Sequence, residues 1–186
     1  ELRWNGQAQR VERVERLQYG AVILSDSVQP EPAGAASDEA TRLLIDQLLD
    51  AGRGGLGQIA EAEAVQILAA RISLLRVTFP DLGVEAMEGP GFAGRLAELC
   101  AGMASFRELR EMDLLAVWMG SLPAAAMQKL ETEVPAAVNL PRRRGVKIHY
   151  EKGKDPWIES RLQDFLGLTE GPRILGGRVP LVLHLL

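Results

Sequence analysis

The chain has 186 residues, of which 47% are hydrophobic and 25% charged, and its formal net charge is −4. This composition is typical of a globular protein that buries a core of its own. The single cysteine, Cys100, excludes an internal disulfide framework and suits a reducing cytoplasm. No apolar run of about 18 residues is present, which argues against a membrane-spanning helix, and no signal peptide opens the chain.

Charge is distributed unevenly along the sequence. Residues 1–138 carry twelve Lys or Arg and twenty Asp or Glu residues, whereas residues 139–186 carry nine and five. The sequence therefore predicts an acidic body joined to a basic end, and this asymmetry bears on the choice of partner.

Residues 1–26 have β character and predict a β-hairpin. The pair Asn5-Gly6 signals a turn, and the run 10–24 is longer than a usual strand, so that Gly20 is expected to mark a bulge or bend within it. A two-stranded hairpin alone is marginal in water. We therefore expect it to belong to a sheet whose other strands lie elsewhere in the chain or outside this sequence.

A linker and a helical domain are predicted next. Residues 27–37 are rich in Pro, Ala, Gly and Ser, which favours a linker. Residues 38–135 predict about five short helices with short connections, which favours a compact helical domain. The helices are expected in DEATRLLIDQLLDAG, IAEAEAVQILAARISLLRVTFP, GFAGRLAELCAGM, SFRELREMDLLAVWMGSL and PAAAMQKLETEVP. Cys100 falls on the third, where a buried structural thiol is the expected role.

Residues 136–186 predict a small mixed α/β unit, so that the whole chain is assigned to the α+β class. Two β segments are expected around PRRRG, and in the second Val146, Ile148 and Tyr150 share one side while Lys147 and His149 share the other. The segment DPWIESRLQDFLGL predicts a helix. The final RVPLVLHLL predicts a strand that must be covered on both faces, because it is almost entirely apolar.

Three kinds of catalytic or ligand site find little support in the sequence. GPRILGGRVPLVL lacks the Lys-Ser/Thr of a phosphate-binding loop and leads into a strand rather than a helix. The two histidines and Cys100 have no metal-ligand spacing. The third kind of site is a thiol hydrolase that uses Cys100, but nothing favours this residue as a nucleophile over a packing role.

The basic segment RRRGVKIHYEKGK is the strongest candidate site, because guanidinium and ammonium groups neutralise phosphates. The alternative is a solvated hairpin whose charges balance the acidic helical body. Tyr150 alternates with core-facing residues and is expected to be packed rather than to stack on a base. The candidate nucleic-acid-binding residues are Arg142, Arg143, Arg144, Lys147, His149, Lys152 and Lys154, with Arg161, Arg173 and Arg178 as weaker candidates. Arg178 is alternatively expected to hold the turn before the last strand by bonding carbonyl groups.

A family resemblance rests on three blocks, VKIHY, SRLQDFLGL and GGRVPLVLHLL, which follow in this order. Together they resemble the C-terminal region of HrpB-type bacterial DExH-box ATP-dependent RNA helicases. Upstream, RVERLQYGAVILSD, ARISLLR with FPDL, and SFRELREMDLL resemble the preceding segments of the family in the same order, so the resemblance covers nearly the whole chain. Together with a first residue, Glu1, that is not Met, it predicts a processed or excised fragment.

The resemblance implies an accessory role in a helicase. Two upstream RecA-like domains would bind and hydrolyse ATP with Mg²⁺, whereas this sequence has no GKT loop and no DExH motif, so we expect no cofactor and no ATPase activity here. The opening hairpin would be the end of an OB-like domain. The expected partners are single-stranded nucleic acid, RNA in the first instance, and the upstream helicase core, in the cytoplasm and away from membranes. The alternative is a protein-docking module that does not touch nucleic acid.

Overall fold

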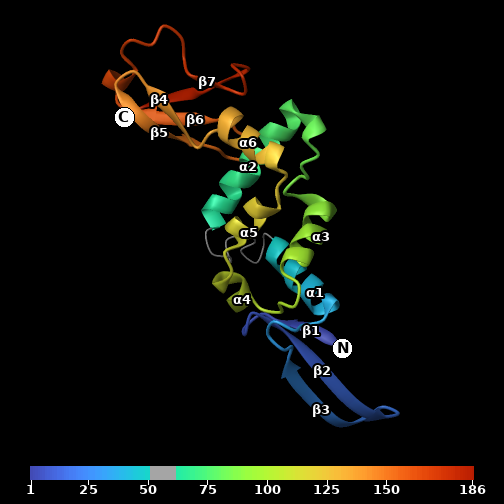
Figure 1. The fold of residues 1–186 in the computed structure, drawn as a ribbon. Coiled ribbons are helices and arrows are strands. Elements are labelled where there is room, and N and C mark those ends of the chain that lie inside the picture. Colours follow the sequence, from blue (N-terminus) through green and yellow to red (C-terminus); the bar gives the residue numbers. More distant parts are fainter. Residues whose placement is uncertain (51–61) are drawn as a thin grey trace. The chain divides into compact units, whose positions relative to one another are not determined.

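The computed structural model describes residues 1–50 and 62–186. It confirms the predicted α+β class, because helices combine with sheets in the described part of the chain (Figure 1). The chain divides into two compact units, one formed by residues 1–63 and 88–118 and the other by residues 64–87 and 119–186. The predicted helical segment 38–135 contributes to both units. The boundaries predicted after residues 26, 37 and 135 mark changes in the sequence pattern. As domain boundaries they stay a prediction.

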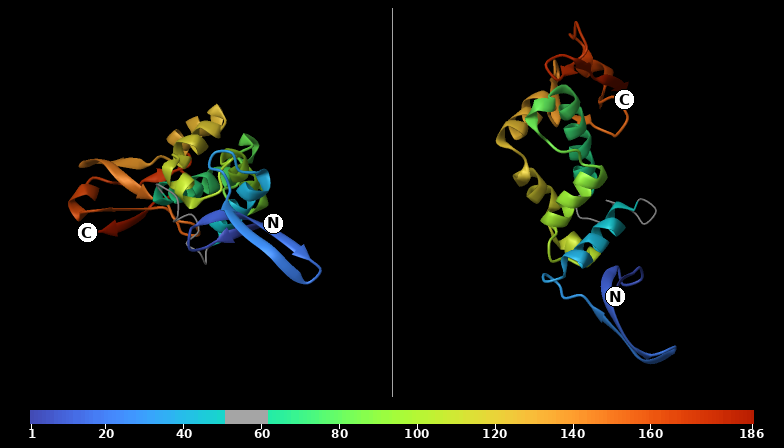
Figure 2. Two further views of the ribbon diagram at one scale, coloured as in Figure 1. Left: turned by 90° about the horizontal axis from the view of Figure 1, so that it is seen from below. Right: turned by 90° about the vertical axis from the view of Figure 1, so that its right-hand side faces the viewer.

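The first unit begins with an antiparallel sheet of order β1-β2-β3. Its strands are β1 (Leu2–Asn5), β2 (Arg10–Tyr19) and β3 (Val22–Pro30). β1 pairs only with the first residues of β2, so the distal part of the β2–β3 hairpin extends past it (Figure 2).

Two predictions for this region are wrong. Gly20 lies in the tight connection between β2 and β3 and has a φ of 58°, a value that glycine adopts without strain, so the chain reverses there instead of bending within one long strand. β3 also continues to Pro30, because its residues keep pairing with β2 as far as Glu12. The first residues of the predicted linker 27–37 are therefore strand.

Helices complete the first unit. They are α1 (Asp38–Leu49), α3 (Gly89–Leu99), α4 (Phe106–Glu111) and the first residues of α5 (Leu114–Ser121). The hydroxyl of Ser37 accepts a hydrogen bond from the Ala40 amide at 3.3 Å and caps α1. Leu44 and Leu96 are fully buried in the core, and the rings of Phe92 and Trp118 pack edge-on with centroids 5.1 Å apart.

The predicted single helix in SFRELREMDLLAVWMGSL is two helices. The break falls between α4 and α5, where the Asp113 carboxylate accepts a hydrogen bond from the Ala116 amide at 2.9 Å. A carboxylate that satisfies an amide of the first turn starts a helix rather than continuing one, which explains the interruption.

Helices of the second unit pack beside a four-stranded sheet. They are α2 (Ala62–Thr78), of which the unit contains the residues from Ala64 on, the 3₁₀ turn η3 (Pro80–Leu82), the end of α5, and α6 (Ala124–Glu133). Pro80, which begins η3, follows shortly after the end of α2. Arg71 of α2 donates hydrogen bonds to the carbonyl oxygens of Leu130 and Val134, at 3.0 and 2.8 Å, and so satisfies groups that the end of α6 leaves unpaired.

The sheet of the second unit has the order β4-β5-β6-β9. Its strands are β4 (Ala137–Leu140), β5 (Arg143–His149), β6 (Trp157–Ser160) and β9 (Val182–Leu185), and β6 pairs with β5 antiparallel and with β9 parallel. The remaining elements are the 3₁₀ turn η4 (Leu162–Phe165) and the short pair β7 (Arg173–Ile174) and β8 (Val179–Pro180). No helix in the described ranges is long and apolar enough to cross a membrane.

The predicted helix in DPWIESRLQDFLGL is wrong, because this segment forms β6 and then η4. Ile158 pairs with Ile148 on one side and Leu183 on the other, and it is fully buried. Its place in the middle of the sheet decides its structure, and the helical spacing of Ile158, Leu162 and Phe165 is overridden by this non-local pairing.

The expectation that the last strand is covered on both faces is also wrong for this structure. β9 is an edge strand, and Val182, Leu183 and Leu185 are 42%, 39% and 62% exposed. The alternation predicted for β5, by contrast, is confirmed. Val146 and Ile148 are buried while Lys147 is exposed.

Candidate nucleic-acid interface

A β-bulge divides the arginines of the basic segment between the two faces of the sheet. Val138 pairs with Val146, but Leu140 pairs with Arg143, so Asn139 lies opposite both Arg144 and Gly145. Gly145 has a φ of 66°, and its amide donates to the Asn139 side chain at 3.0 Å. This is the geometry of a bulge that needs glycine at one position.

The shift of register has a consequence for each arginine. Arg143 lies on the face of Leu140 and Val146, whereas Arg144 lies on the opposite face with Asn139 and Lys147. We call this second face, which carries Asn139, Arg144, Lys147, His149, Trp157, Glu159, Val182 and His184, the open face. Simple alternation along the sequence would have placed Arg144 with Val146.

Arg143 is held by an internal polar cluster. Its guanidinium donates to the Ser160 hydroxyl at 3.1 Å and lies 3.7 Å from the Asp164 carboxylate. The Ser160 hydroxyl donates to the same carboxylate at 2.6 Å. That hydrogen bond holds the pKa of Asp164 below its ordinary value, against the opposing effect of burial and with further help from the Arg161 amide and the Arg143 charge. Arg143 thus has a structural partner, which the sequence did not reveal.

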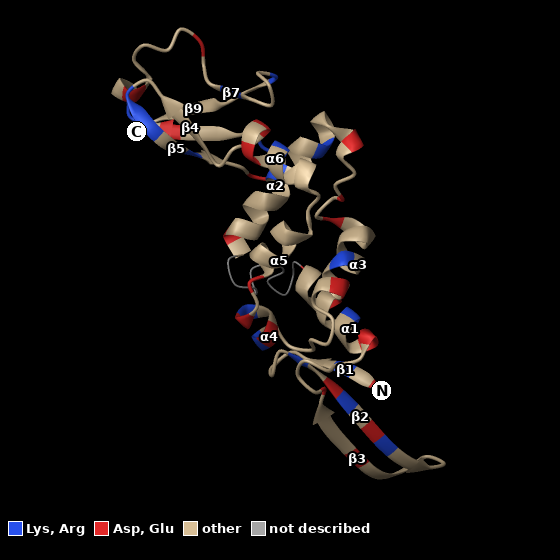
Figure 3. Ribbon diagram, in the orientation of Figure 1, with Lys and Arg blue, Asp and Glu red and all other residues tan. Residues whose placement is uncertain are grey.

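Arg142 and Arg144 differ from Arg143. Both are exposed, Arg142 in the turn between β4 and β5 and Arg144 in the bulge, and neither forms an ion pair within the described part of the chain. Figure 3 shows this basic stretch at the start of β5, at one end of the sheet. Lys147, also exposed, continues it along the open face. Arg142 and Arg144, which have no ion-pair partner in the described residues, are the cations best able to meet phosphates.

In the turn after β5, Lys154 is paired with Glu151, a carboxylate that also bonds the Trp157 ring. Hydrogen bonds and charge from Lys154 lower the pKa of Glu151, with a smaller contribution from a hydrogen bond with Trp157 and from His149. Lys152 of the same turn is exposed.

Of the three weaker candidates, Arg161 lies near Arg143, because both contact Asp164, whereas Arg173 and Arg178 belong to the β7–β8 segment. Arg161 is exposed, and its backbone amide bonds Asp164 at 3.3 Å. Arg173 donates to the Gly177 carbonyl at 3.1 Å, and Arg178 lies with its guanidinium carbon 5.7 Å from the centre of the Phe79 ring. The turn-holding role predicted for Arg178 therefore belongs to Arg173, whose guanidinium donates to a carbonyl of that turn.

An aromatic stack that the sequence did not predict crosses the open face. The rings of His149 and Trp157 are 3.8 Å apart and nearly parallel, at 8°, and those of Trp157 and His184 are 4.6 Å apart at 21°. His149 and Trp157 are register partners on neighbouring strands. The sequence signal was the Trp at position 157, but assigning it to a helix concealed its partner. Tyr150 is packed on the other face, as predicted, and its hydroxyl donates to the Pro135 carbonyl at 2.6 Å.

Cys100 has the predicted packing role. The thiol is fully buried in the first unit, and burial raises its pKa to about 12. Both histidines belong to the second unit, so the unit that contains this thiol offers no imidazole to activate it. Within residues 1–50 and 62–186, no cluster of His, Cys, Asp or Glu side chains could hold a metal ion.

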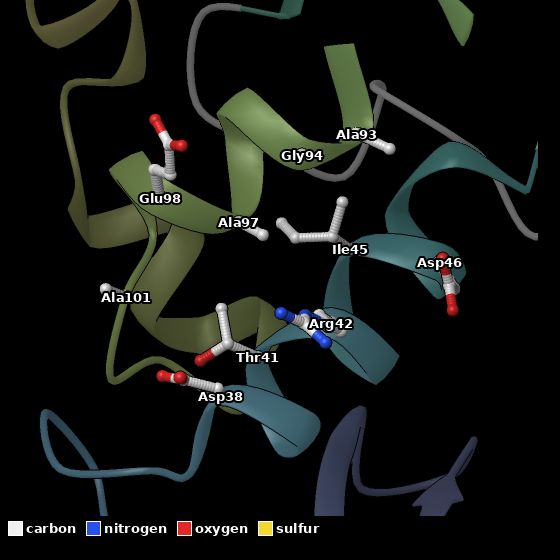
Figure 4. A pocket seen from close by; sticks show the side chains of 10 residues that line it. All are labelled: Asp38, Thr41, Arg42, Ile45, Asp46, Ala93, Gly94, Ala97, Glu98 and Ala101. Carbon is white, nitrogen blue, oxygen red and sulfur yellow. The ribbon is translucent and has the colours of Figure 1, made fainter. Parts of the chain in front are cut away.

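A pocket of about 670 Å³ lies in the first unit between α1 and α3 (Figure 4). Three carboxylates and one guanidinium combine there with small side chains, a charge balance that disfavours phosphate. Its lining residues are Asp38, Thr41, Arg42, Ile45, Asp46, Ala93, Gly94, Ala97, Glu98 and Ala101.

Comparison with known proteins agrees with the predicted resemblance. Residues 95–186, which include the four-stranded sheet, match the family described as ATP-dependent helicase C-terminal, HrpB_C. The ATP-dependent RNA helicase HrpB of Escherichia coli (strain K12) is 29% identical over 187 residues, which cover all of this chain and 23% of that protein.

Two solved structures give the same result. A crystal structure of the E. coli DExH-box NTPase HrpB has a TM-score of 0.70 at 28% identity, and one of the E. coli DEAH/RHA helicase HrpB has a TM-score of 0.68 at 27% identity. Each comparison covers all of this chain and 23% of the solved chain, so the chain spans about a quarter of the length of these relatives. The predicted resemblance is thus confirmed, and over its whole length this chain is similar to the C-terminal region of HrpB-type ATP-dependent helicases.

Proposed function

We propose that the chain is a non-catalytic accessory region of an ATP-dependent helicase, which contacts single-stranded nucleic acid through the basic end of its four-stranded sheet. RNA is the first candidate, because the curated relative is an RNA helicase. The upstream motor domains of the parent would bind ATP and Mg²⁺ and would be a partner of this region, in the cytoplasm. This region itself would bind no cofactor.

The observation that supports this function best is the exposure of Arg142 and Arg144 without an ion pair in the described part of the chain. They stand close together in the chain, at the turn and bulge that join β4 to β5. Each phosphate that they neutralise releases counterions, and each contact to a single strand adds about −0.7 to the slope of log K against log salt.

A binding titration at several salt concentrations tests this function. A fluorescently labelled 12-nucleotide RNA is titrated with the natural chain and with the double variant Arg142→Ala/Arg144→Ala. The variant should bind more weakly and show a slope that is about 1.4 smaller in magnitude, for two lost phosphate contacts. Arg107→Ala is the matched control, because Arg107 is an exposed arginine of α4 that is paired with Glu111. Salt-independent binding, or a slope unchanged by the double variant, would contradict the proposal.

The second candidate, a protein-docking module, is favoured by a different observation. The distal part of the β2–β3 hairpin exposes a cluster of large apolar side chains, and such clusters often mark interaction surfaces. Their exposed fractions are 63% for Leu17, 82% for Tyr19, 60% for Val22, 53% for Ile23 and 61% for Leu24. This function predicts that the chain binds the upstream part of a parent helicase in sedimentation experiments, and that Tyr19→Ser with Ile23→Ser weakens that binding without affecting RNA.

A further inference from the structure

We propose that the open face of the four-stranded sheet is a base-stacking site, where a nucleobase of single-stranded nucleic acid continues the ring stack of His149, Trp157 and His184 while Arg144 and Lys147 meet the backbone. This inference rests on the proposed function and adds the part of the ligand that is recognised.

The stack is built by the register of three strands. β5 and β6 place His149 beside Trp157, and the parallel pairing of β6 with β9 places Val182 beside Trp157 and His184 beside Glu159. The centre of the His184 ring nevertheless lies 4.6 Å from the centre of the Trp157 ring. Trp157 therefore has an imidazole on each side, and the faces left for another ring are the two ends of the stack.

The end at His184 is the more accessible one. β9 is the edge strand of this sheet, and His184 is exposed, whereas His149 lies on the inner strand β5 and is only half-exposed. A base that stacks on an exposed aromatic ring gains affinity whichever base it is, because every base has a π face. A ring stack at an open edge therefore suits single strands of mixed sequence.

Charge on the open face orients the ligand. Arg144 and Lys147 lie on β5, while Glu159 lies on β6 opposite His184 and would repel a phosphate there. Neighbouring strands are about 4.8 Å apart, so β5 and β9 are separated by roughly 10 Å, which a nucleotide can bridge with its base at one strand and its phosphate nearer the other. The sugar-phosphate backbone is thus directed to β5 and the base to β9.

The stack is also fixed before any ligand arrives. Glu151, which is paired with Lys154, has a hydrogen bond with Trp157. A ring held in one orientation loses little conformational entropy when a base stacks on it. The same turn thus gives Lys154 a positioning role in place of the phosphate contact predicted for it.

Two ligands of equal charge separate base stacking from phosphate binding. The natural chain is titrated with a 12-nucleotide oligouridine RNA and with an abasic ribose-phosphate chain of the same length. We expect tighter binding of oligouridine, together with a change in tryptophan fluorescence. His184→Ala should weaken oligouridine binding about tenfold, the equivalent of one stacked base, and leave the abasic affinity and the salt slope unchanged. Val182→Ala is the matched control, because it lies on the same strand and face without a ring.

Each result of this experiment either supports the base-stacking site or overturns it. If neither ligand binds in a salt-dependent way, the proposed function fails and this inference with it. If both bind equally and His184→Ala changes neither affinity, base stacking is overturned while phosphate binding stands. Should His184→Ala unfold, the histidine ring protons of the natural chain give the answer by NMR. They should shift upfield with oligouridine but not with the abasic chain, and equal or absent shifts would overturn the inference.

Discussion

The three-stranded sheet of the first unit and the four-stranded sheet of the second both carry arginines on their strands, but the arginines have different surroundings. In the first sheet Arg13 is 2.8 Å from Glu31, and Arg16 is 3.2 Å from Asp26. In the second, Arg142 and Arg144 have no such partner in the described part of the chain. Figure 3 shows acidic and basic residues alternating along β2 and a basic stretch at the start of β5.

Glu12 shows how fully the first sheet satisfies its charges. Burial alone would raise the pKa of this carboxylate, but hydrogen bonds from Asn5 and Arg10 and the charge of Arg10 lower it below its ordinary value. Arg3 lies 3.5 Å away on β1. A buried charge needs this many partners, so these arginines are committed to the fold.

The difference has a cause in the neighbouring strands. β4, which lies beside Arg144, has the sequence AVNL and offers no carboxylate, whereas the strands beside β2 carry Asp26 and are followed by Glu31. The number of basic residues therefore indicates a binding surface less well than the side chains on the neighbouring strands do, because these decide whether an arginine is already paired. Arg144, which lies opposite β4 and on the other face from Arg143, remains available to a ligand.

The largest expected effect on stability comes from truncating a buried side chain in the middle of the four-stranded sheet. Ile158→Ala should lower the free energy of unfolding by about 2–5 kcal/mol, because it leaves a cavity between β5 and β9. Urea-induced unfolding followed by tryptophan fluorescence measures the loss. Leu183→Ala is the control, because Leu183 is the register partner of Ile158 but is 39% exposed, and its loss should be clearly smaller. Equal losses would show that β6 is not the centre of this sheet.

An intermediate effect is expected at the bulge that separates Arg143 from Arg144. Gly145→Ala should lower the free energy of unfolding by about 1–2 kcal/mol, because its φ of 66° strains a residue with a Cβ atom. Gly145→Asn should lower the free energy of unfolding less than Gly145→Ala does, since Asn tolerates this conformation better than Ala. Gly120 of α5 has an ordinary φ and open space around it, so Gly120→Ala should cost nothing. Equal behaviour of the two alanine variants in urea unfolding would contradict the bulge.

Local patterns in the sequence predicted local features, and non-local pairing decided the rest. The alternation of Val146, Ile148 and Tyr150 identified β5, and the helical pattern in DEATRLLIDQLLDAG identified α1. The stack on Trp157 was missed because a helix was predicted there, and because His184, far away in the sequence, comes close to Trp157 through a parallel strand pair.

The same limit applied to the arginines. The Arg143–Asp164 contact joins β5 to a 3₁₀ turn, and the bulge that turns Arg144 to the open face depends on the pairing with β4. Neither could be read from RRRG alone. The sequence could thus predict that this end of the chain is basic, but not which of its arginines are already paired.

The smallest effect tests the comparison of the two sheets directly. Arg144→Ala should change the free energy of unfolding by less than about 0.5 kcal/mol, because an exposed side chain without a partner contributes little to the fold. Arg13→Ala removes the same group from the other sheet but leaves the Glu31 carboxylate, whose side chain is 2% exposed, without its ion-pair partner. It should therefore be the more destabilising of the two, and urea unfolding of both variants at neutral pH measures the difference. If Arg144→Ala proved as damaging as Arg13→Ala, Arg144 would be structural as Arg143 is, and the surface assigned to nucleic acid would lose the property that distinguishes it from β2.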